Sequence, residues 1–373
     1  MRNRNMKKFI FEIAVYVLML SIFFCIFGVA VFAANTKIDA EITEIEPLKN
    51  LRIEGIEELK AAFSNEVQIP AAAVASLPSS VDLTSRFPTP GNQGSLNAGI
   101  EWAICYFQAN AQRNYFGWDI SKESHHFNPE FLFNQKNGGH NLSTNIYDAA
   151  LLVNQKGVCT NTYRTVTGTD YTTQPTDRQK ENAKLYKTGE WLMASGLSTL
   201  KSVLNSGSGV LVSIRAFPDF DAISASNPVY DTVSGSKTGE YVLCLIGYDD
   251  NKGGGAFKFI NSHGTSWGVN GYGWISYNLM NLATVSLFGK NTGYLPNDTV
   301  DMHDYQMGDI NGDGNVTSAD ARLSLRFAAK LETPTNKQFV LADVNGDAKV
   351  NSSDASALQK YVAHTISHLP IYD

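Results

Sequence analysis

The feature that most constrains this chain is a twelve-residue pattern that occurs twice near its C-terminal end. DINGDGNVTSAD spans residues 309–320, and DVNGDAKVNSSD spans residues 343–354. In both copies an oxygen-bearing side chain stands at loop positions 1, 3, 5, 9 and 12. A hard cation such as Ca²⁺ takes roughly six to eight oxygen ligands, which a curved loop supplies from alternate positions and from a backbone carbonyl. The repeat therefore predicts two bound calcium ions, one in each loop.

The expected ligands follow from those positions and from position 7. In the first loop they are Asp309, Asn311, Asp313, Asn315, Thr317 and Asp320, and in the second loop Asp343, Asn345, Asp347, Lys349, Asn351 and Asp354. Asn315 and Lys349 stand at position 7, where the backbone carbonyl binds the ion and the side chain need not. An EF-hand loop follows a helix and closes with Glu, whereas these loops close with Asp and have no predicted entering helix. Amphipathic segments over 321–331 and 355–364 predict a helix after each loop.

With this duplication and these departures, the segment from 309 to about 370 resembles a dockerin, the calcium-dependent module that attaches enzymes to cohesins on a scaffoldin. The resemblance implies a small all-α domain over residues 308–373 and a cohesin as partner. It also implies that the cohesin is recognised by ten side chains: Ser318, Ala319, Leu325, Arg326, Lys330, Ser352, Ser353, Gln359, Lys360 and His364. Arg326 and Lys360 occupy matching places in the two copies, which fits a near-symmetric binding surface. The alternative is that the two loops only stabilise a small domain.

The N-terminal residues have the composition of a secretory leader. Basic side chains are frequent over Arg2–Lys8, residues 13–34 carry no charge, and small residues around Ala33 suit a signal peptidase. We expect residues 1–33 to be a cleaved signal peptide and the remainder to be secreted, at the cell surface in a cellulosome. Because the apolar run is long enough to span a bilayer, an uncleaved anchor is the alternative, and a membrane is expected as a partner only in that case.

Composition excludes one class of partner and limits the role of the cysteines. The formal net charge is -6 and no run of Lys or Arg stands out, which argues against nucleic acid as a partner. Of the four cysteines, Cys25 lies in the leader, and Cys105, Cys159 and Cys244 remain. The apolar surroundings of Cys105 and Cys244 predict small buried side chains. One disulfide among the three is the alternative, and the sequence does not choose the pair.

The region between the leader and the loops is predicted to be one large domain. Residues 34–77 are expected to be a spacer or pro-segment, residues 78–291 the main body, and residues 292–307 a linker. The body predicts helices first, over 100–114, 128–135 and 145–157, and strands later, over 209–217, 241–250, 256–261 and 271–277. In the first of these strands, alternation between Val210, Val212 and Ile214 and the residues between them predicts one buried face. Segregated helices and strands indicate an α+β fold.

Two motifs at the start of the body resemble papain-like cysteine peptidases of the bacterial sort. PSSVDL at 78–83 and NQG at 92–94 match the beginning of the mature enzymes, which continue QGSLGSC up to the nucleophilic Cys. This chain continues QGSLNAG, and the positions of Gln93 and Leu96 set the register. Gly99 therefore stands where the family has its nucleophile.

Two later motifs extend the resemblance to the end of the body. GEYVLCLIGYD over 239–249 matches the motif of the catalytic His and has Tyr241 at that position. KFINSHGTSWG over 258–268 keeps the family's Asn as Asn261 and has His263 where a Trp shields the Asn–His hydrogen bond. The resemblance implies a two-lobed domain, with a helical lobe and a β-barrel-like lobe, followed by the dockerin.

The replaced residues bear directly on catalysis. In this family a thiolate attacks the peptide carbonyl, an imidazolium activates it, Asn orients the ring, and Gln donates to the oxyanion, the role that falls here to Gln93. Gly99 has no side chain, and a tyrosine such as Tyr241 titrates at about pH 10, too high for a base at neutral pH. Cys105, six residues further on, would lie about 240° around the helix and roughly 9 Å along it, facing away from the cleft. Ser95 is another candidate nucleophile, but it has no evident base beside it. His263 is the remaining candidate for a substitute base.

The sequence therefore predicts a catalytically impaired papain-like component that binds polypeptide in its cleft and is tethered through its dockerin, and leaves its enzyme status open. One alternative is an active hydrolase of this family with non-standard residues that include His263. Another is a purely structural docking protein. A glycoside hydrolase, a common neighbour of such modules, is disfavoured because no segment suggests the paired carboxylates of that chemistry. His125, His126 and His140 are expected at the surface or in loops and have no metal-ligand spacing.

Overall fold

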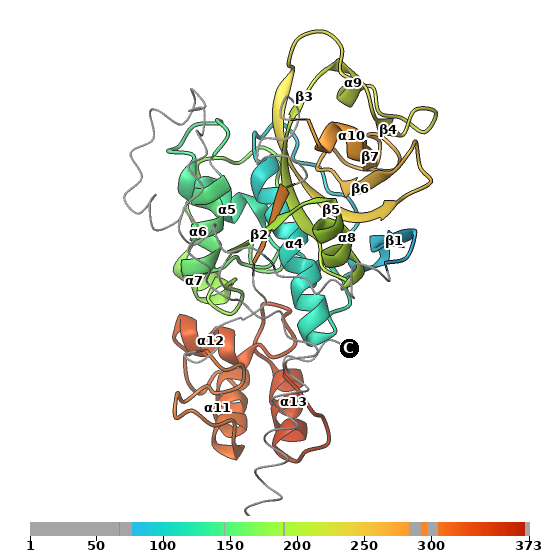
Figure 1. Ribbon diagram of the computed structural model, residues 1–373. Helices are drawn as coiled ribbons and strands as arrows, with labels where there is room; N and C mark the ends of the chain where they lie inside the picture. The colour runs from blue at the N-terminus through green and yellow to red at the C-terminus, as the bar shows by residue number, and fades with distance from the viewer. Residues whose placement is uncertain are drawn as a thin grey trace, which may run out of the picture.

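The computed structural model describes residues 67, 77–144, 146–188, 191–282, 292–296 and 305–369. The expected signal peptide over 1–33 and nearly all of the expected spacer over 34–77 lie outside these residues. Figure 1 shows a larger unit of helices and strands, with a smaller helical unit at one end. Within the described ranges, no helix combines the length and the hydropathy that crossing a bilayer requires.

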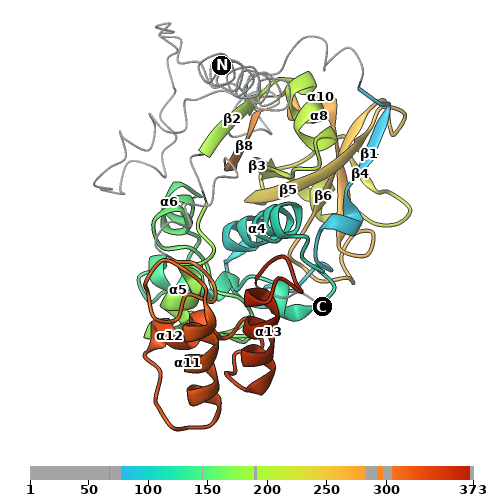
Figure 2. The same cartoon turned by 90° about the horizontal axis from the view of Figure 1, so that it is seen from below.

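Three helices pack together on one side of the larger unit: α4 (Gly99–Phe116), α5 (Pro129–Lys136) and α6 (Ile146–Lys156). The side chain of Asn128 accepts a hydrogen bond from the Phe131 N–H at 2.8 Å and so begins α5. In Figure 2, α4 lies between the sheet and the other two helices, which makes it the central element of the domain. The helices expected over 100–114, 128–135 and 145–157 are thus present.

A fourth helix, α7 (Asp177–Ala183), begins with a capping box between Thr176 and Gln179. It packs against the turn after α6, where Gly157 has a φ of 77°. A Cβ on Gly157 would lie 1.8 Å from the carbonyl oxygen of Ala183, so this close approach requires glycine.

The other side of the unit is an eight-stranded sheet in the order β2-β8-β3-β5-β6-β7-β4, with β1 paired to β5. Neighbouring strands are antiparallel except β4 and β7, which are parallel. The strands are β1 (Ser80–Asp82), β2 (Trp191–Ser195), β3 (Val210–Ala216), β4 (Val229–Tyr230), β5 (Gly239–Asp249), β6 (Ala256–Ile260), β7 (Tyr272–Ser276) and β8 (Thr292–Pro296). The short helices are the 3-10 helices η2 (Thr84–Arg86) and η3 (Glu123–His125) and the α-helices α8 (Leu197–Asn205), α9 (Pro218–Asp221) and α10 (Tyr277–Met280).

Three sequence-based expectations are wrong in this unit. β3 is buried on both faces, because Leu211 and Ser213 are covered as well as their neighbours, and α4 and α8 both pack against this part of the sheet. The segment 292–307 does not begin as a linker, because residues 292–296 form β8 and pair with β2, about a hundred residues earlier. His125 is buried, with its ring 4.7 Å from that of Trp118.

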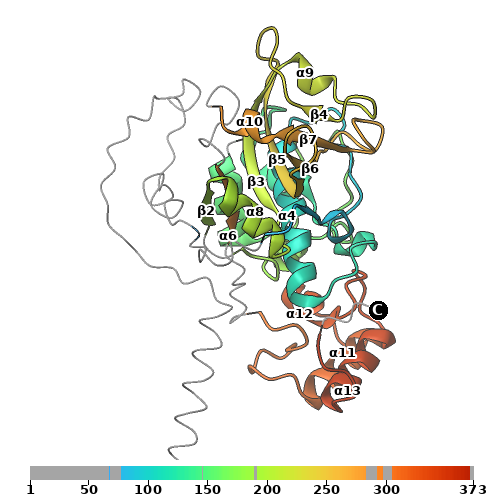
Figure 3. The same ribbon diagram turned by 45° about the vertical axis from the view of Figure 1, so that its right-hand side comes forward.

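The smaller unit contains α11 (Ser318–Ala328), α12 (Asn336–Ala342) and α13 (Ser352–Val362). α11 and α13 pack against each other, and α12 packs against α7 of the larger unit. Figure 3 shows these helices at the end of the molecule away from the strands. Mixed α+β architecture with a separate small helical unit confirms the predicted fold class.

Candidate functional site

The candidate cleft is formed where the loop before α4 pairs with the loop after β6. The Gln93 N–H donates to the Ser262 carbonyl at 2.8 Å, and the Gly264 N–H donates to the Gly91 carbonyl at 2.8 Å. The hydroxyl of Tyr106 joins the two loops, since it accepts from the Gly91 N–H at 2.7 Å and donates to the Asn261 carbonyl at 3.2 Å. These contacts, with the bridge between Asn92 and His263, bring Gln93 close to Asn261 and His263 despite long separations in sequence.

Gly99 is the first residue of α4 and is partly exposed. Among the described residues, the heavy atom that an added Cβ would meet is Gln93 Oε1, at 3.4 Å, which is ordinary van der Waals contact. The position therefore faces the predicted oxyanion donor and has room for a side chain. Gln93 itself is engaged, because its Nε2 donates to the Leu96 carbonyl at 2.6 Å and its Oε1 accepts from Ser262 Oγ at 2.6 Å.

Tyr241 lies in β5 opposite Ile214 of β3 and is half-buried. Its ring centroid is 6.1 Å from that of His263 and 4.9 Å from that of Phe220. Burial, and then the negative charge of Asp221, raise the pKa of the Tyr241 phenol above its usual value of 10. The phenol is therefore neutral at physiological pH and does not act as a base.

His263 is also half-buried, with its ring centroid 6.1 Å from that of Trp267. Burial lowers the pKa of the His263 imidazole below 6.5, and the charge of Asp221 partly opposes this effect. The ring is therefore neutral near pH 7. A neutral imidazole has the protonation state of a general base, but the adjacent aromatic ring is a phenol and no thiol lies at position 99.

Asn261 is buried, with 3% of its surface exposed. Its Oδ1 accepts a hydrogen bond from the N–H of Ser262 at 2.8 Å, and its Nδ2 has no partner among the described residues. A buried donor without a partner costs about 1–3 kcal/mol. The buried Asn261 amide thus has a free donor at the place where the motif predicts a histidine-orienting Asn.

The two C-terminal loops share the hydrogen bonds that their first Asp accepts, and in the first loop the last Asp also accepts from the start of the loop. In the first loop, Asp309 Oδ1 accepts from the N–H of Asp313 at 3.1 Å, and Asp320 Oδ1 accepts from the N–H of Ile310 at 2.9 Å. In the second, Asp343 Oδ1 accepts from the N–H of Asp347 at 3.0 Å. The closing Asp residues also cap α11 and α13 through capping boxes.

The buried carboxylates of the second loop fit a hard cation. Asp354 Oδ1 is buried and has no hydrogen-bond partner among the described residues. Burial, with the charges of Asp354 and Asp347, raises the pKa of Asp343 to about 7, and burial also raises the pKa of Asp354. Calcium would compensate these charges with the oxygen ligands it prefers. In the described part of the chain, however, no three His, Cys, Asp or Glu side chains converge as a metal-binding group, so the two ions stay a prediction.

Comparison with known families assigns both units. Residues 134–287 match the family described as papain family cysteine protease, and residues 307–363 match the dockerin type I domain. The chain therefore contains a papain-family match followed by a dockerin type I match. The papain-family match includes Tyr241, Asn261 and His263 but begins after Gly99, so the absence of a nucleophile at position 99 stays a prediction from the sequence motif.

Solved structures agree on the fold of the papain-family domain. Xylellain, a cysteine protease from Xylella fastidiosa, is similar with a TM-score of 0.53 and 19% identity, over 63% of this chain and 90% of that one. Procathepsin B S9 from Trypanosoma congolense is similar with a TM-score of 0.51 and 15% identity, over 64% of this chain and 84% of that one. A comparison with curated proteins gives no significant match.

The cysteines of the papain-family domain do not replace the missing nucleophile. Cys105, Cys159 and Cys244 are free thiols, so the structure contains no disulfide among them, and all three are buried. Burial raises the pKa of the Cys105 thiol well above its usual value, and nearby Cys159 and Glu101 act in the same direction. None of the three thiols is exposed to a substrate.

Sequence reasoning missed one unusual group, the buried carboxyl of Glu101 in the first turn of α4. It accepts a hydrogen bond from the hydroxyl of Thr144, and its Oε2 has no partner among the described residues. Burial raises the pKa of Glu101 to about 7. The signal was a lone acidic residue in the otherwise apolar run GIEWAICYF.

The partner-reading positions implied for the dockerin lie on α11 and α13 or directly after these helices. Ala319 is partly buried, whereas the other positions are exposed: Ser318, Leu325, Arg326, Lys330, Ser352, Ser353, Gln359, Lys360 and His364. α12 faces the papain-family domain instead. The surface predicted to read a cohesin is therefore accessible in this arrangement.

Proposed function

We propose that this chain is a secreted component of a cellulosome, in which a papain-family domain without peptidase activity binds a polypeptide segment and a dockerin attaches it to a cohesin. The observation that carries the proposal is the Gly99 position. It faces Gln93 and has space for a side chain, but supplies none. The cleft therefore keeps the frame of a peptidase without its nucleophile.

The chemical consequence of two missing groups is severe. Gly99 offers no atom that could form an acyl-enzyme. The raised pKa of Tyr241 keeps its phenol protonated, so the phenol cannot accept a proton as a neutral imidazole would. In a serine hydrolase triad, loss of the nucleophile or of the base lowers kcat by about 10⁶-fold. Turnover of peptides by this domain is therefore expected to be below detection.

Binding of a polypeptide is supported by the groups that persist. The N-terminus of the long helix α4 favours a partial negative charge such as a peptide carbonyl oxygen. Gln93 uses one N–H for Leu96, and its amide carries a second donor. The partly exposed rings of Tyr241 and Trp267 pack on the buried ring of Phe220 and lie beside His263, which suits an apolar side chain of a ligand.

Attachment through the dockerin is supported by its exposed outer helices and by its loops. When bound, calcium would neutralise the carboxylates of Asp309, Asp320, Asp343 and Asp354 and hold each loop in its folded form. The exposed basic side chains of Arg326 and Lys360, on equivalent turns of α11 and α13, suit an acidic patch on a cohesin.

The decisive experiment restores the missing groups. Purified wild type and the double variant Gly99→Cys/Tyr241→His are assayed with a panel of fluorogenic peptides, with each single variant as a control. We expect no turnover by the wild type and measurable, thiol-reagent-sensitive turnover by the double variant alone. Wild-type turnover that persists after removal of contaminating proteases would refute the proposal.

A second candidate function is an unconventional hydrolase that uses His263. The observation in its favour is the neutral imidazole of His263 beside the position of the lost base. If wild type shows turnover, His263→Ala abolishes it under this alternative, whereas His368→Ala, an exposed control in the dockerin, leaves it unchanged.

A purely docking role is distinguished by binding. Peptides selected from a random library on the full chain should lose affinity in Trp267→Ala if the cleft holds them. A chain that retains no peptide, and binds a cohesin in calcium, has only the docking function.

A further inference from the structure

The dockerin contacts the papain-family domain through α12 and the second calcium loop. The guanidinium of Arg178, in α7, lies over the ring of Phe339, in α12, 3.9 Å from its centroid. Arg178 Nε also donates to Asn336 Oδ1 at 3.4 Å. Val340 and Leu341 are buried in a core cluster that is continuous with that of the papain-family domain. The contact is therefore apolar at its centre and polar at its edge, as in a specific interface.

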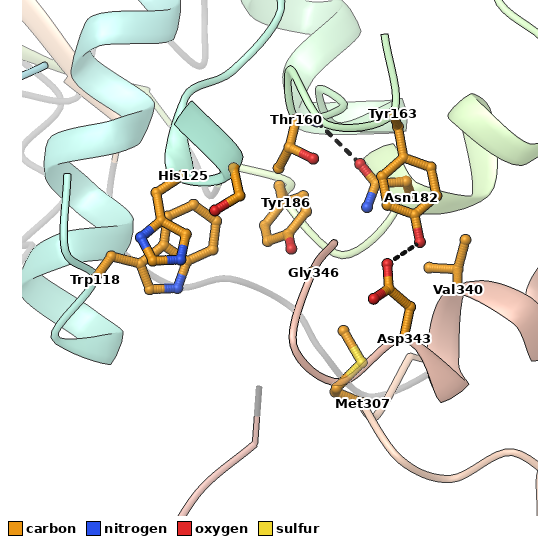
Figure 4. Close-up of a pocket in the computed structure, with 11 residues that line it drawn as sticks. Trp118, His125, Thr160, Tyr163, Asn182, Tyr186, Met307, Val340, Asp343 and Gly346 are labelled. Carbon is orange, nitrogen blue, oxygen red and sulfur yellow. Dashed lines mark hydrogen bonds between the residues drawn. The ribbon is translucent and has the colours of Figure 1, made fainter. Parts of the chain in front are cut away.

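One hydrogen bond in this contact reaches a predicted calcium ligand. Figure 4 shows the hydroxyl of Tyr163, from the papain-family domain, directed at the carboxylate of Asp343. The Tyr163 hydroxyl donates to Asp343 Oδ2 at 2.6 Å, the usual length of a hydrogen bond from a hydroxyl to a carboxylate. Asp343 is position 1 of the second loop and is 1% exposed.

The two loops differ in this respect although their sequences repeat. Asp309, the equivalent of Asp343, is 8% exposed, and its hydrogen-bond donors among the described residues are N–H groups of its own loop. Residues 311–315 of the first loop are exposed, whereas residues 345–348 of the second are only partly exposed. The papain-family domain thus covers the second loop and leaves the first in solvent.

We propose that the papain-family domain is part of the second calcium site, because Tyr163 positions the Asp343 carboxylate for the ion. A partner that hydrogen-bonds a ligating carboxylate fixes its orientation, and loss of such a partner typically weakens metal affinity by about 10–100-fold. Binding couplings are reciprocal, so calcium in the second loop strengthens the contact between the two domains. The first loop binds calcium independently of the papain-family domain.

This inference rests on the calcium binding proposed above and not on the properties of the cleft. Its consequence is a calcium-dependent orientation of the papain-family domain. Because the predicted cohesin-reading positions on α11 and α13 point away from the contact, a dockerin bound to a cohesin still holds the domain. Calcium would therefore set both attachment to the scaffold and the direction in which the cleft faces.

The first test measures calcium affinity by isothermal titration of the full chain with calcium chloride. Asp313→Ala disables the first loop and Asp347→Ala the second, at the same loop position, so each background reports one site. Tyr163→Phe should weaken the affinity by about 10-fold or more in the Asp313→Ala background and leave the Asp347→Ala background unchanged. Tyr186→Phe, which removes another phenol hydroxyl from the same pocket, is the matched control and should change neither.

The second test measures how calcium binding to the second loop affects α7 of the papain-family domain. Hydrogen exchange of the amides in α7 should slow on addition of calcium in wild type and in Asp313→Ala, but not in Asp347→Ala or Tyr163→Phe. Equal effects of Tyr163→Phe on both sites, no effect on either, or calcium-independent exchange in α7 would overturn the inference alone. A wild type that binds no calcium would overturn the proposed calcium binding as well.

Discussion

Replacing Gly99 by Ala is expected to stabilise the papain-family domain, because the structure leaves space for one methyl group there. The nearest contact of the added Cβ would be Gln93 Oε1 at 3.4 Å, which requires no movement. Gly99 begins α4 and is not among the residues with positive φ, so alanine can adopt its conformation. Glycine in the middle of a helix costs about 0.5–1 kcal/mol relative to alanine, which is the upper limit for the first residue of α4. Since 1 kcal/mol shifts the Tm of a domain of this size by roughly 2–4 °C, we expect a rise of up to about 4 °C.

The assay is thermal unfolding followed by circular dichroism, with urea unfolding as a check on the free energy. Gly157→Ala is the matched control, because its Cβ would lie 1.8 Å from the Ala183 carbonyl and its φ is 77°. That variant should lose at least about 1–3 kcal/mol from backbone strain alone. A fall in Tm for Gly99→Ala would refute the reasoning, since it would mean that the fold requires glycine at this position and that a thiol could not be restored there.

Two further predictions concern charge. Burial raises the pKa of Glu101 from 4.5 to about 7, so the folded protein holds a proton that the unfolded chain has lost, and stability should fall as the pH rises from about 4.5 to 7. In Glu101→Gln this part of the pH dependence should vanish, and an unchanged profile in urea titrations at pH 5 and pH 8 would contradict the burial of the carboxyl. Calcium at about 100 times its Kd should stabilise the dockerin by about 2.7 kcal/mol per site. EDTA should reverse that gain and abolish cohesin binding in a pull-down, whereas cohesin binding that persists in EDTA would count against calcium-dependent docking.

Much of the fold and of the candidate sites can be predicted from short-range patterns in the sequence. The two acidic loops, the helices that follow them and the cleft motifs are local in sequence, because spacing along the chain sets which side chains share a turn or a face. The predicted replacement of the nucleophile by Gly99 and of the base by Tyr241 likewise comes from the motifs. The family and fold comparisons agree with the predicted papain-like fold and with the predicted dockerin.

The rest depends on contacts between residues far apart in the chain. Composition suggested a linker over residues 292–307, but residues 292–296 form β8 and pair with β2. Alternation of apolar residues suggested that β3 has one exposed face, but the packed structure buries both faces. Whether position 99 has room, and whether Glu101 meets water, depends on neighbours from other elements. Tyr163 and Asp343 are separated by 180 residues, and only tertiary packing makes one of two similar predicted calcium loops a part of the domain interface. Sequence thus determined which chemical groups are present, and the fold decided which of them meet and which are removed from solvent.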